Sequence, residues 1–231
     1  MSASERPRGG SPAEQRASHQ AGSRPKRLVF VSGTATEVGK TWWTAATARE
    51  LRALGATVAA RKPVQSGEPG SVTDAEHLAA ATGEVPDAVC APHRTYRLAW
   101  APPMAARELG EPGFTTADLT RELGWPAAVD VGLVEGVGGP RSPVSDDGDN
   151  VDLAAALAPD VIVVVGDAGL GTINAVRLSV EAFRPFPVIV ALNRYTDDPL
   201  HQRNLEHLSS VDGCDVVTAP RALAARLRIP S

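Results

Sequence analysis

The stretch Leu28-Val-Phe-Val-Ser-Gly-Thr-Ala-Thr-Glu-Val-Gly-Lys-Thr41 decides the fold of this chain. It joins an apolar run, typical of a buried strand, to a glycine-rich turn, and an alanine-rich helical segment follows from Thr44 to Leu54. A strand that leads through such a turn into a helix aims backbone N–H groups and the positive helix end at one point. We therefore expect polyphosphate to bind there, with Lys40 reaching the outer phosphates and Thr41 holding Mg²⁺.

The spacing of the turn differs from the commonest phosphate-loop pattern. Five residues separate Gly33 from Gly39, whereas the usual pattern has four, so a strict search would require glycine at Thr34. The alternative is an ordinary strand-to-helix turn with a surface lysine. The preceding strand and the following helix, which Gly55 ends, favour the phosphate loop.

Length and composition indicate one globular domain. The 231 residues are 43% hydrophobic and 22% charged, which is ordinary for a domain with a substantial core. The net charge of −4 offers no general attraction to nucleic acid. Cys90 and Cys214 have no metal-ligand spacing around them, so we expect buried or idle thiols and a reducing, cytoplasmic setting.

The first 26 residues differ in composition from the rest. Ser, Gly, Pro, Arg and Gln dominate there, and we expect residues 1–26 to be a disordered N-terminal tail and residues 27–231 to be one domain. The tail has no hydrophobic stretch of the kind found in secretory signals, and no run long enough to enter a membrane. We therefore expect no membrane partner.

From Arg27 onward, short apolar runs alternate with helical segments. This pattern predicts an α/β fold: a single-domain, P-loop NTPase-like, three-layer structure with a mainly parallel sheet flanked by helices. In such sheets ligands collect at the carboxyl ends of the strands. The expected strands are 28–32, 57–61, 130–134, 161–165, 188–192 and 215–218, and the expected helices are 42–54, 74–82, 115–123, 151–157, 172–183, 200–208 and 221–227.

Three charged side chains stand at or near predicted strand ends. Lys62, followed by the rigid Pro63, either adds a second cation beside the phosphate loop or merely caps its strand in solvent. Asp74 either binds a metal or is a plain helix cap. Glu135 directly follows a buried apolar strand, where a carboxylate is costly without a partner. Thr41, Asp74 and Glu135 together could supply the oxygen ligands that nucleotide-bound Mg²⁺ prefers.

Two further groups of side chains carry no metal prediction. The acidic cluster of Asp146, Asp147, Asp149 and Asp152 lacks the ligand spacing of a calcium loop, so we expect a solvated turn. The five histidines form no pair at metal-ligand spacing.

Read in order, several segments resemble the motifs of the dethiobiotin synthetase family. The resemblance runs from about Arg27 to about Asn193, and the combination is far more specific than any single motif. The family is a homodimeric phosphate-loop enzyme that converts 7,8-diaminononanoate, CO₂ and ATP to dethiobiotin, ADP and phosphate with Mg²⁺. The segments are Gly33–Thr41, Lys62–Gly67, Asp74, Val134–Gly139, Leu170–Asn174 and Asn193.

The resemblance implies a role for each matching residue. Lys40 and Lys62 would neutralise the transferred phosphoryl group and the carbamate oxygens, while Thr36 and Ser66 would orient carbamate and diamine. The substrate carboxylate would reach the neighbouring subunit at a helix start. The implied nucleotide-binding residues are Glu37, Val38, Gly39, Lys40, Thr41, Trp42, Asp74, Glu135, Gly136, Val137, Gly138 and Asn193, with Asn193 reading the base, and the carboxylate-binding residues are Thr172, Ile173 and Asn174.

Some features leave alternatives open. Val137 and the bulky Trp42-Trp43 pair depart from the family pattern, and the chain ends soon after Pro220, so CTP or another nucleotide is an alternative to ATP. A partitioning or metal-insertion ATPase would carry a signature lysine at Ala35, and a glutamine-dependent amidase would need a further domain. A nucleotide-binding sensor or scaffold without catalysis is the remaining alternative.

Overall fold

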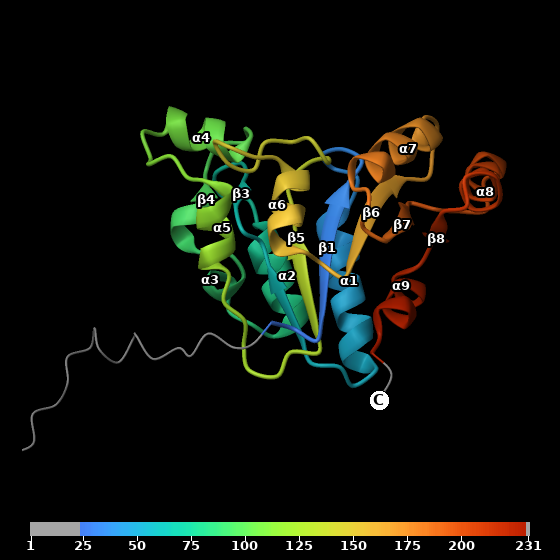
Figure 1. Ribbon diagram of the computed structural model, residues 1–231, viewed down its shortest axis with the longest axis horizontal. Coiled ribbons are helices and arrows are strands. Elements are labelled where there is room, and N and C mark those ends of the chain that lie inside the picture. Colours follow the sequence, from blue (N-terminus) through green and yellow to red (C-terminus); the bar gives the residue numbers. More distant parts are fainter. Residues whose placement is uncertain (1–23, 230–231) are drawn as a thin grey trace, which may run out of the picture.

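The core of the molecule is a six-stranded parallel sheet, seen in a computed structural model that describes residues 24–229 (Figure 1). The strand order is β2-β5-β1-β6-β7-β8, which places β1 and the turn that follows it near the middle of the sheet. All six predicted strands are confirmed to within two residues of their expected bounds. They are β1 (Arg27–Gly33), β2 (Val58–Arg61), β5 (Val131–Glu135), β6 (Val161–Asp167), β7 (Val188–Asn193) and β8 (Asp215–Val217).

The alternation of side chains along β1 explains why helices cover both faces of the sheet. Val29 and Val31 pack into one hydrophobic cluster, whereas Leu28 and Phe30 pack into another on the opposite face. Every residue of β1 after Arg27 is buried, as expected for a parallel strand covered on both sides. The predicted three-layer architecture is therefore confirmed.

The helices divide between these two faces (Figure 1). The cluster of Val29 and Val31 includes residues of α1 (Lys40–Ala53), α2 (Asp74–Thr82), α3 (Pro86–Val89) and α9 (Pro220–Leu227). The other face is covered by α4 (Pro102–Glu108), α5 (Thr116–Glu122), α6 (Asn150–Leu157) and α7 (Thr172–Ala182). The chain also contains α8 (Pro199–Glu206), the short helices η1 (Pro92–Arg94) and η2 (His207–Val211), and a two-stranded parallel pair of β3 (Gln65–Ser66) and β4 (Thr95–Tyr96).

Side-chain caps define where several helices begin. Thr73 and Glu76 form a reciprocal capping box at α2, and Asp149 and Asp152 do the same at α6. Two of the four clustered aspartates therefore act as helix caps. The carboxylate of Asp147 accepts a hydrogen bond from the backbone N–H of Thr116 at 2.7 Å.

The first residues described belong to the segment that we expected to be a tail. Arg24 donates to the backbone carbonyl of Ala158 at 2.7 Å, and the N–H of Lys26 donates to Val129 O at 3.0 Å. The described body therefore begins before Arg27, and residues 1–23 of the predicted tail lie outside the described residues. Between residues 24 and 229, no helix combines the length and the hydropathy needed to cross a bilayer.

Candidate active site

The glycine-rich turn lies at the carboxyl end of β1, where it leads into α1 at Lys40. Gly39 has φ 95°, a left-handed conformation that favours glycine. A Cβ atom at this position would lie 2.1 Å from Nδ2 of Asn193, which itself donates to the carbonyl of Val38 at 2.9 Å. Glycine is therefore required here both by the backbone and by the close approach of β7.

Lys40 is buried in the turn rather than extended into solvent. Its Nζ atom donates to the backbone carbonyl of Ala35 at 3.0 Å. Burial, together with the positive charge of Lys62, lowers the pKa of Lys40 from 10.5 to about 8. An anion beside Lys40 would favour the protonated ammonium and raise this pKa again.

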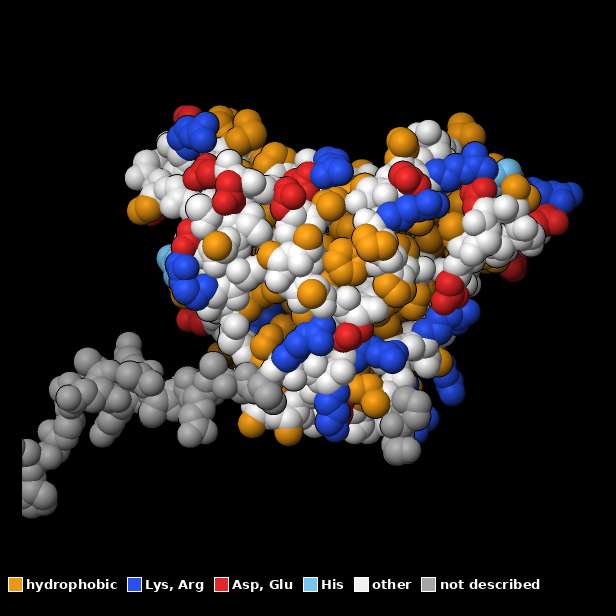
Figure 2. Space-filling model, viewed as in Figure 1, with side chains coloured by type: hydrophobic (Ala, Val, Ile, Leu, Met, Phe, Trp, Pro, Cys, Tyr) orange, Lys and Arg blue, Asp and Glu red, His pale blue; other side chains and the backbone are white. Residues whose placement is uncertain are grey.

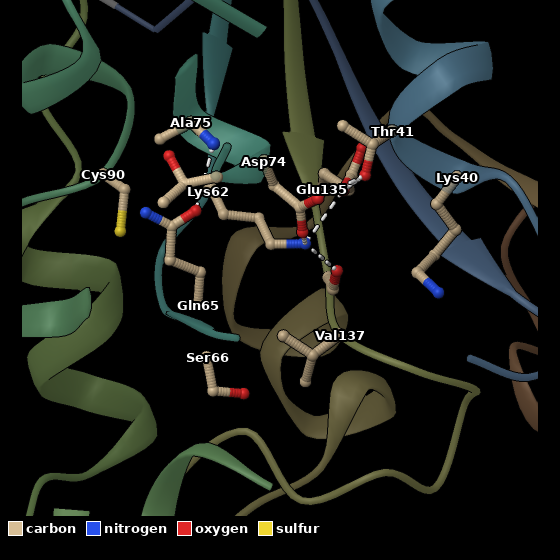
Figure 3. A network of polar contacts seen from close by, with 12 residues as sticks. Lys40, Thr41, Lys62, Gln65, Ser66, Asp74, Ala75, Cys90, Glu135 and Val137 are labelled. Atoms are coloured by element: carbon tan, nitrogen blue, oxygen red, sulfur yellow. Dashed lines mark hydrogen bonds and ion pairs between the residues drawn. The ribbon is translucent and has the colours of Figure 1, made fainter. Parts of the chain in front are cut away.

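Lys62 follows the end of β2 and is surrounded by oxygen atoms (Figure 3). Its Nζ lies 2.7 Å from Asp74 Oδ2, 2.8 Å from Glu135 Oε1 and 2.9 Å from Gly136 O. Burial by itself would lower the pKa of Lys62, but Asp74 and Glu135 outweigh it and the pKa is raised. The positive charge of Lys62 in turn lowers the pKa of Asp74 to about 2. The solvent-cap alternative for Lys62 is wrong, because only 2% of its side chain is exposed.

Thr41 and the two carboxylates bring their oxygens to one point. The Thr41 hydroxyl lies 2.8 Å from Asp74 Oδ1 and 2.8 Å from Glu135 Oε1, and Thr44 Oγ1 donates to Glu135 Oε2 at 2.7 Å. A hydroxyl has one proton and can donate to only one of its two carboxylate neighbours. The hydroxyl and the two carboxylates thus bring together oxygen atoms with more lone pairs than protons to share. Oxygen ligands of this kind suit a hard cation such as Mg²⁺.

A cavity of about 510 Å³ opens beside these groups. Its lining includes the charged groups of Lys40, Lys62 and Asp74, and also an apolar part to which Trp42 and Val137 contribute. In Figure 3, Ser66 and Val137 lie on the same side of the Lys62 network. The structure thus gathers most of the predicted site around one space, lined by Thr36, Glu37, Gly39, Lys40, Thr41, Trp42, Lys62, Ser66, Asp74, Val137 and Gly138.

The remaining predicted residues lie elsewhere. Val38 is buried beneath the turn, Glu135 lies at the end of β5 with Gly136 directly after it, and Asn193 engages the turn from β7. Thr172 is buried at the start of α7, and its hydroxyl has no hydrogen-bond partner within residues 24–229.

The rest of the α7 start is divided between core and surface. Ile173 packs against the core, while Asn174 lines an open hollow of about 710 Å³. Thr36 lines both this hollow and the main cavity, so the two spaces adjoin.

Sequence reasoning missed three residues that shape the site. Thr44 follows Thr41 by three positions, the spacing that places two side chains on one helix face. Asn150 is fully buried and donates to the carbonyls of Val137 and Gly139, so it holds the segment after Glu135. Trp100 lines the cavity in a loop with no periodic pattern, and its carbonyl accepts the Ser66 hydroxyl at 2.6 Å.

Comparisons with known proteins relate the chain to one family. A family model described as an AAA domain matches residues 27–219. The chain is 38% identical to the ATP-dependent dethiobiotin synthetase BioD of Anaeromyxobacter sp. (strain Fw109-5), with 81% of this chain and 86% of that protein covered. It is 36% identical to the protein of the same name from Rhodococcus jostii (strain RHA1), with 87% and 88% covered.

Solved structures support the fold alone. A putative plasmid partition protein from Borrelia burgdorferi B31, bound to AMPPNP, superposes with a TM-score of 0.52 at 13% identity, over 88% of each chain. A likeness at 13% identity shows the fold and not the activity. The sequence relatives are far more similar, and they carry one name. The chain therefore belongs to the dethiobiotin synthetase family of ATP-dependent ligases.

Proposed function

We propose that this protein carries out the complete synthetase reaction of biotin biosynthesis in the cytoplasm. One amine of 7,8-diaminononanoate takes up CO₂ as a carbamate, and a carbamate oxygen attacks the γ-phosphorus of ATP with departure of ADP. The second amine then attacks the carbonyl carbon of the mixed anhydride, which closes the ureido ring and releases phosphate. Negative charge accumulates on the transferred phosphoryl group, so fixed cations carry much of the catalysis.

The observation that carries this proposal is that Lys40 and Lys62 line one cavity. Lys40 is placed to contact the outer phosphates from the turn, and Lys62 approaches from β2. Thr36 and Ser66 line the same cavity and are placed to orient the carbamate and the diamine. The apolar wall beside Trp100 suits the aliphatic chain of the diamine.

Thr41, Asp74 and Glu135 would hold Mg²⁺. When bound, Mg²⁺ would neutralise charge on the nucleotide phosphates. Lys62 orients both carboxylates before nucleotide arrives, because its Nζ lies within 2.8 Å of an oxygen of each of them. Thr44 fixes the other oxygen of Glu135, so only part of the carboxylate remains available to a cation.

We further propose a homodimer in which the start of α7 serves the neighbouring subunit. Its N–H groups would receive the substrate carboxylate at Thr172, Ile173 and Asn174. Hydrophobic side chains gather between α6 and α7 on the face in Figure 2, and Leu178 of α7 is 67% exposed. An exposed apolar area of this kind favours a protein contact.

Asn193 is the residue placed to contact the nucleotide base. Asn193 accepts from Trp43 Nε1 at 3.1 Å and donates to Val38 O. A side-chain amide has two N–H groups and two lone pairs, so one of each remains for a base. We propose ATP as the co-substrate, with CTP as the alternative to be compared directly.

The test is the release of phosphate from ATP with and without each co-substrate. We expect release only when both diaminononanoate and bicarbonate are present, together with a product of the mass of dethiobiotin. Hydrolysis that ignores the diamine and rises with a protein partner would favour a partitioning ATPase. Tight nucleotide binding without turnover in any mixture would favour the sensor and contradict the proposal.

A further inference from the structure

Two consecutive residues at the end of β7 bind two consecutive carbonyl groups of the phosphate-binding turn. Asn193 Nδ2 donates to Val38 O at 2.9 Å, and Arg194 Nη2 donates to Glu37 O at 3.0 Å. These bonds join segments that are more than 150 residues apart in the chain. Arg194 does not line the main cavity, so its contact is with the turn itself.

The contact fixes the direction of the backbone N–H groups in the turn. In a trans peptide the C=O and the N–H of one peptide unit point in opposite directions. The carbonyl of Glu37 shares its peptide unit with the N–H of Val38, and the carbonyl of Val38 shares its unit with the N–H of Gly39. When β7 holds both carbonyls, both N–H groups are turned to the opposite side of the turn, where they can donate to phosphate.

The turn needs such support because its backbone is strained. Glu37 has φ 61°, a left-handed conformation that costs a residue with a Cβ atom free energy, and Gly39 also has positive φ. Strained conformations persist when surrounding contacts hold them. The Glu37 side chain is exposed. The hydrogen bond from Arg194 to the Glu37 carbonyl therefore fixes the backbone of this residue directly.

Arg194 is itself fixed from a third strand. Its Nη1 donates to Asp167 Oδ2 at 2.6 Å, and the other oxygen of Asp167 accepts the N–H of Gly169 at 2.9 Å. The hydrogen bond from Arg194, followed by that from Gly169, lowers the pKa of Asp167. Asp167 is the last residue of β6 and is paired in register with Asn193. The guanidinium therefore bridges the end of β6 and the turn after β1.

We propose that Arg194 is a positioning residue that preorganises the phosphate-binding turn for the polyphosphate of a nucleotide, whatever the base. The fork of the guanidinium reaches two acceptors at once, which the compact ammonium of a lysine cannot do in the same geometry. This inference rests on the nucleotide-binding part of the proposed function. It adds a residue that acts on the turn rather than on the reacting atoms.

The decisive variant is Arg194→Ala, measured by calorimetry with two probes, ADP and inorganic tripolyphosphate. We expect both probes to bind about fivefold more weakly, which corresponds to about 1 kcal/mol at tenfold per 1.4 kcal/mol. Tripolyphosphate carries no base, so an equal loss for both probes locates the effect at the turn. A loss for ADP with unchanged tripolyphosphate binding would make Arg194 a base contact and overturn the proposal.

A matched control is Arg226→Ala on α9, which removes an ion pair of similar exposure with Asp215. We expect wild-type binding of both probes for this variant. The thermal unfolding midpoint of Arg194→Ala should lie close to that of the control, because each variant removes one exposed pair and Arg194→Ala removes only one further exposed hydrogen bond. An unfolding midpoint far below the control, with binding restored at low temperature, would assign Arg194 to general stability and contradict a role in the turn.

Two further variants test the bridge. Arg194→Lys keeps the charge without the fork and should show most of the loss, while Asp167→Asn should show a smaller loss in the same direction. Wild-type affinity in Arg194→Lys would mean that charge alone matters and would overturn the bridging role. In turnover assays the KM for ATP should rise and the KM for the diamine should not. If the wild type shows no diamine-dependent turnover, the proposed function fails while the two binding probes still decide the role of Arg194.

Discussion

Replacing Lys62 by methionine tests the centre of the site most directly. Methionine has a similar unbranched side chain but no charge, so the change removes the ammonium that lies between Asp74 and Glu135. Glu135 is fully buried and would remain as a charge without its cation. Breaking a buried pair by removing one partner costs about 3–5 kcal/mol, because the other charge stays in a poorly solvating environment.

Two denaturation experiments measure this cost. We expect the free energy of unfolding of Lys62→Met, from urea titration in EDTA, to fall by about 3–5 kcal/mol. At about 2–4 °C per kcal/mol for a chain of this size, the unfolding midpoint would fall by about 6–20 °C. Adding MgCl₂ should recover part of the loss, since a cation held by Thr41, Asp74 and Glu135 can replace the missing positive charge. Phosphate release should fall by about 100-fold or more.

The matched control is the double variant Lys62→Met, Glu135→Gln. Removing both partners leaves no uncompensated charge at Glu135, so we expect the double variant to be more stable than Lys62→Met alone. Its stability should also respond less to MgCl₂. The reasoning would be refuted if Lys62→Met unfolded like the wild type in EDTA, or if the double variant were the less stable of the two.

Three further predictions concern the cavity. Nucleotide binding should take up a proton around and above pH 8 and weaken as the pH rises, because burial and Lys62 lower the pKa of Lys40 to about 8 and phosphate would raise it again. Well below pH 8 Lys40 is protonated before and after binding, so calorimetry in two buffers should find that this uptake vanishes there, and Lys40→Met should lack it. Gly39→Ala should weaken ADP binding by more than about tenfold in calorimetry, because residue 39 has positive φ and a Cβ atom there would clash with Asn193 Nδ2. Adding Asn193→Ala should restore only part of the affinity, since it removes the clash but leaves the positive φ of residue 39 unchanged. Trp100→Ala should raise the KM for the diamine by about fivefold in steady-state assays and leave the KM for ATP unchanged, because the half-exposed indole that lines the cavity is lost. An equal rise in both KM values would contradict the assignment of this wall to the diamine.

The fold could be predicted from the sequence because its strands are strongly apolar and its helices alternate with them. The run from Val161 to Val165 is apolar and buried at every position, as expected for a strand that helices cover on both faces. Helix α2 has the bounds that the sequence predicts, but its cap is Thr73, which forms a capping box with Glu76, and not Asp74. These signals lie within a few residues of one another, so no tertiary information was needed.

Apart from α2 and α5, the elements between β2 and β5 could not be predicted in the same way. Helices α3 and α4 are short and begin at Pro86 and Pro102, with too few turns for a periodic pattern to emerge. Strands β3 and β4 have two residues each, and they pair only because tertiary packing brings them together. Trp100 lies in this region, and for that reason its place in the cavity was missed.

The residue types of the site were predictable, but their pairing was not. Lys62 was expected to be a free cation near phosphate, and nothing in the sequence places its ammonium on Glu135, which is 73 residues away. The pairing follows from strand order, because β2 and β5 are neighbours whose carboxyl ends lie at the same edge of the sheet. A long-range contact of this kind depends on topology rather than on local pattern.

The two carboxylates are not equivalent, and the difference bears on how the site can accept a cation. The Glu135 side chain is 0% exposed and is held by Lys62, Thr41 and Thr44, whereas 39% of the Asp74 side chain is exposed. A group bonded on all sides cannot change partners without a large loss, while a half-exposed group can rotate into water at little cost. Asp74 is therefore the carboxylate free to exchange between the Lys62 ammonium and a cation, while Glu135 keeps its bond to Lys62 and offers a cation only its remaining lone pairs. The phosphate-facing end of the site can then gain a divalent charge without releasing its buried lysine.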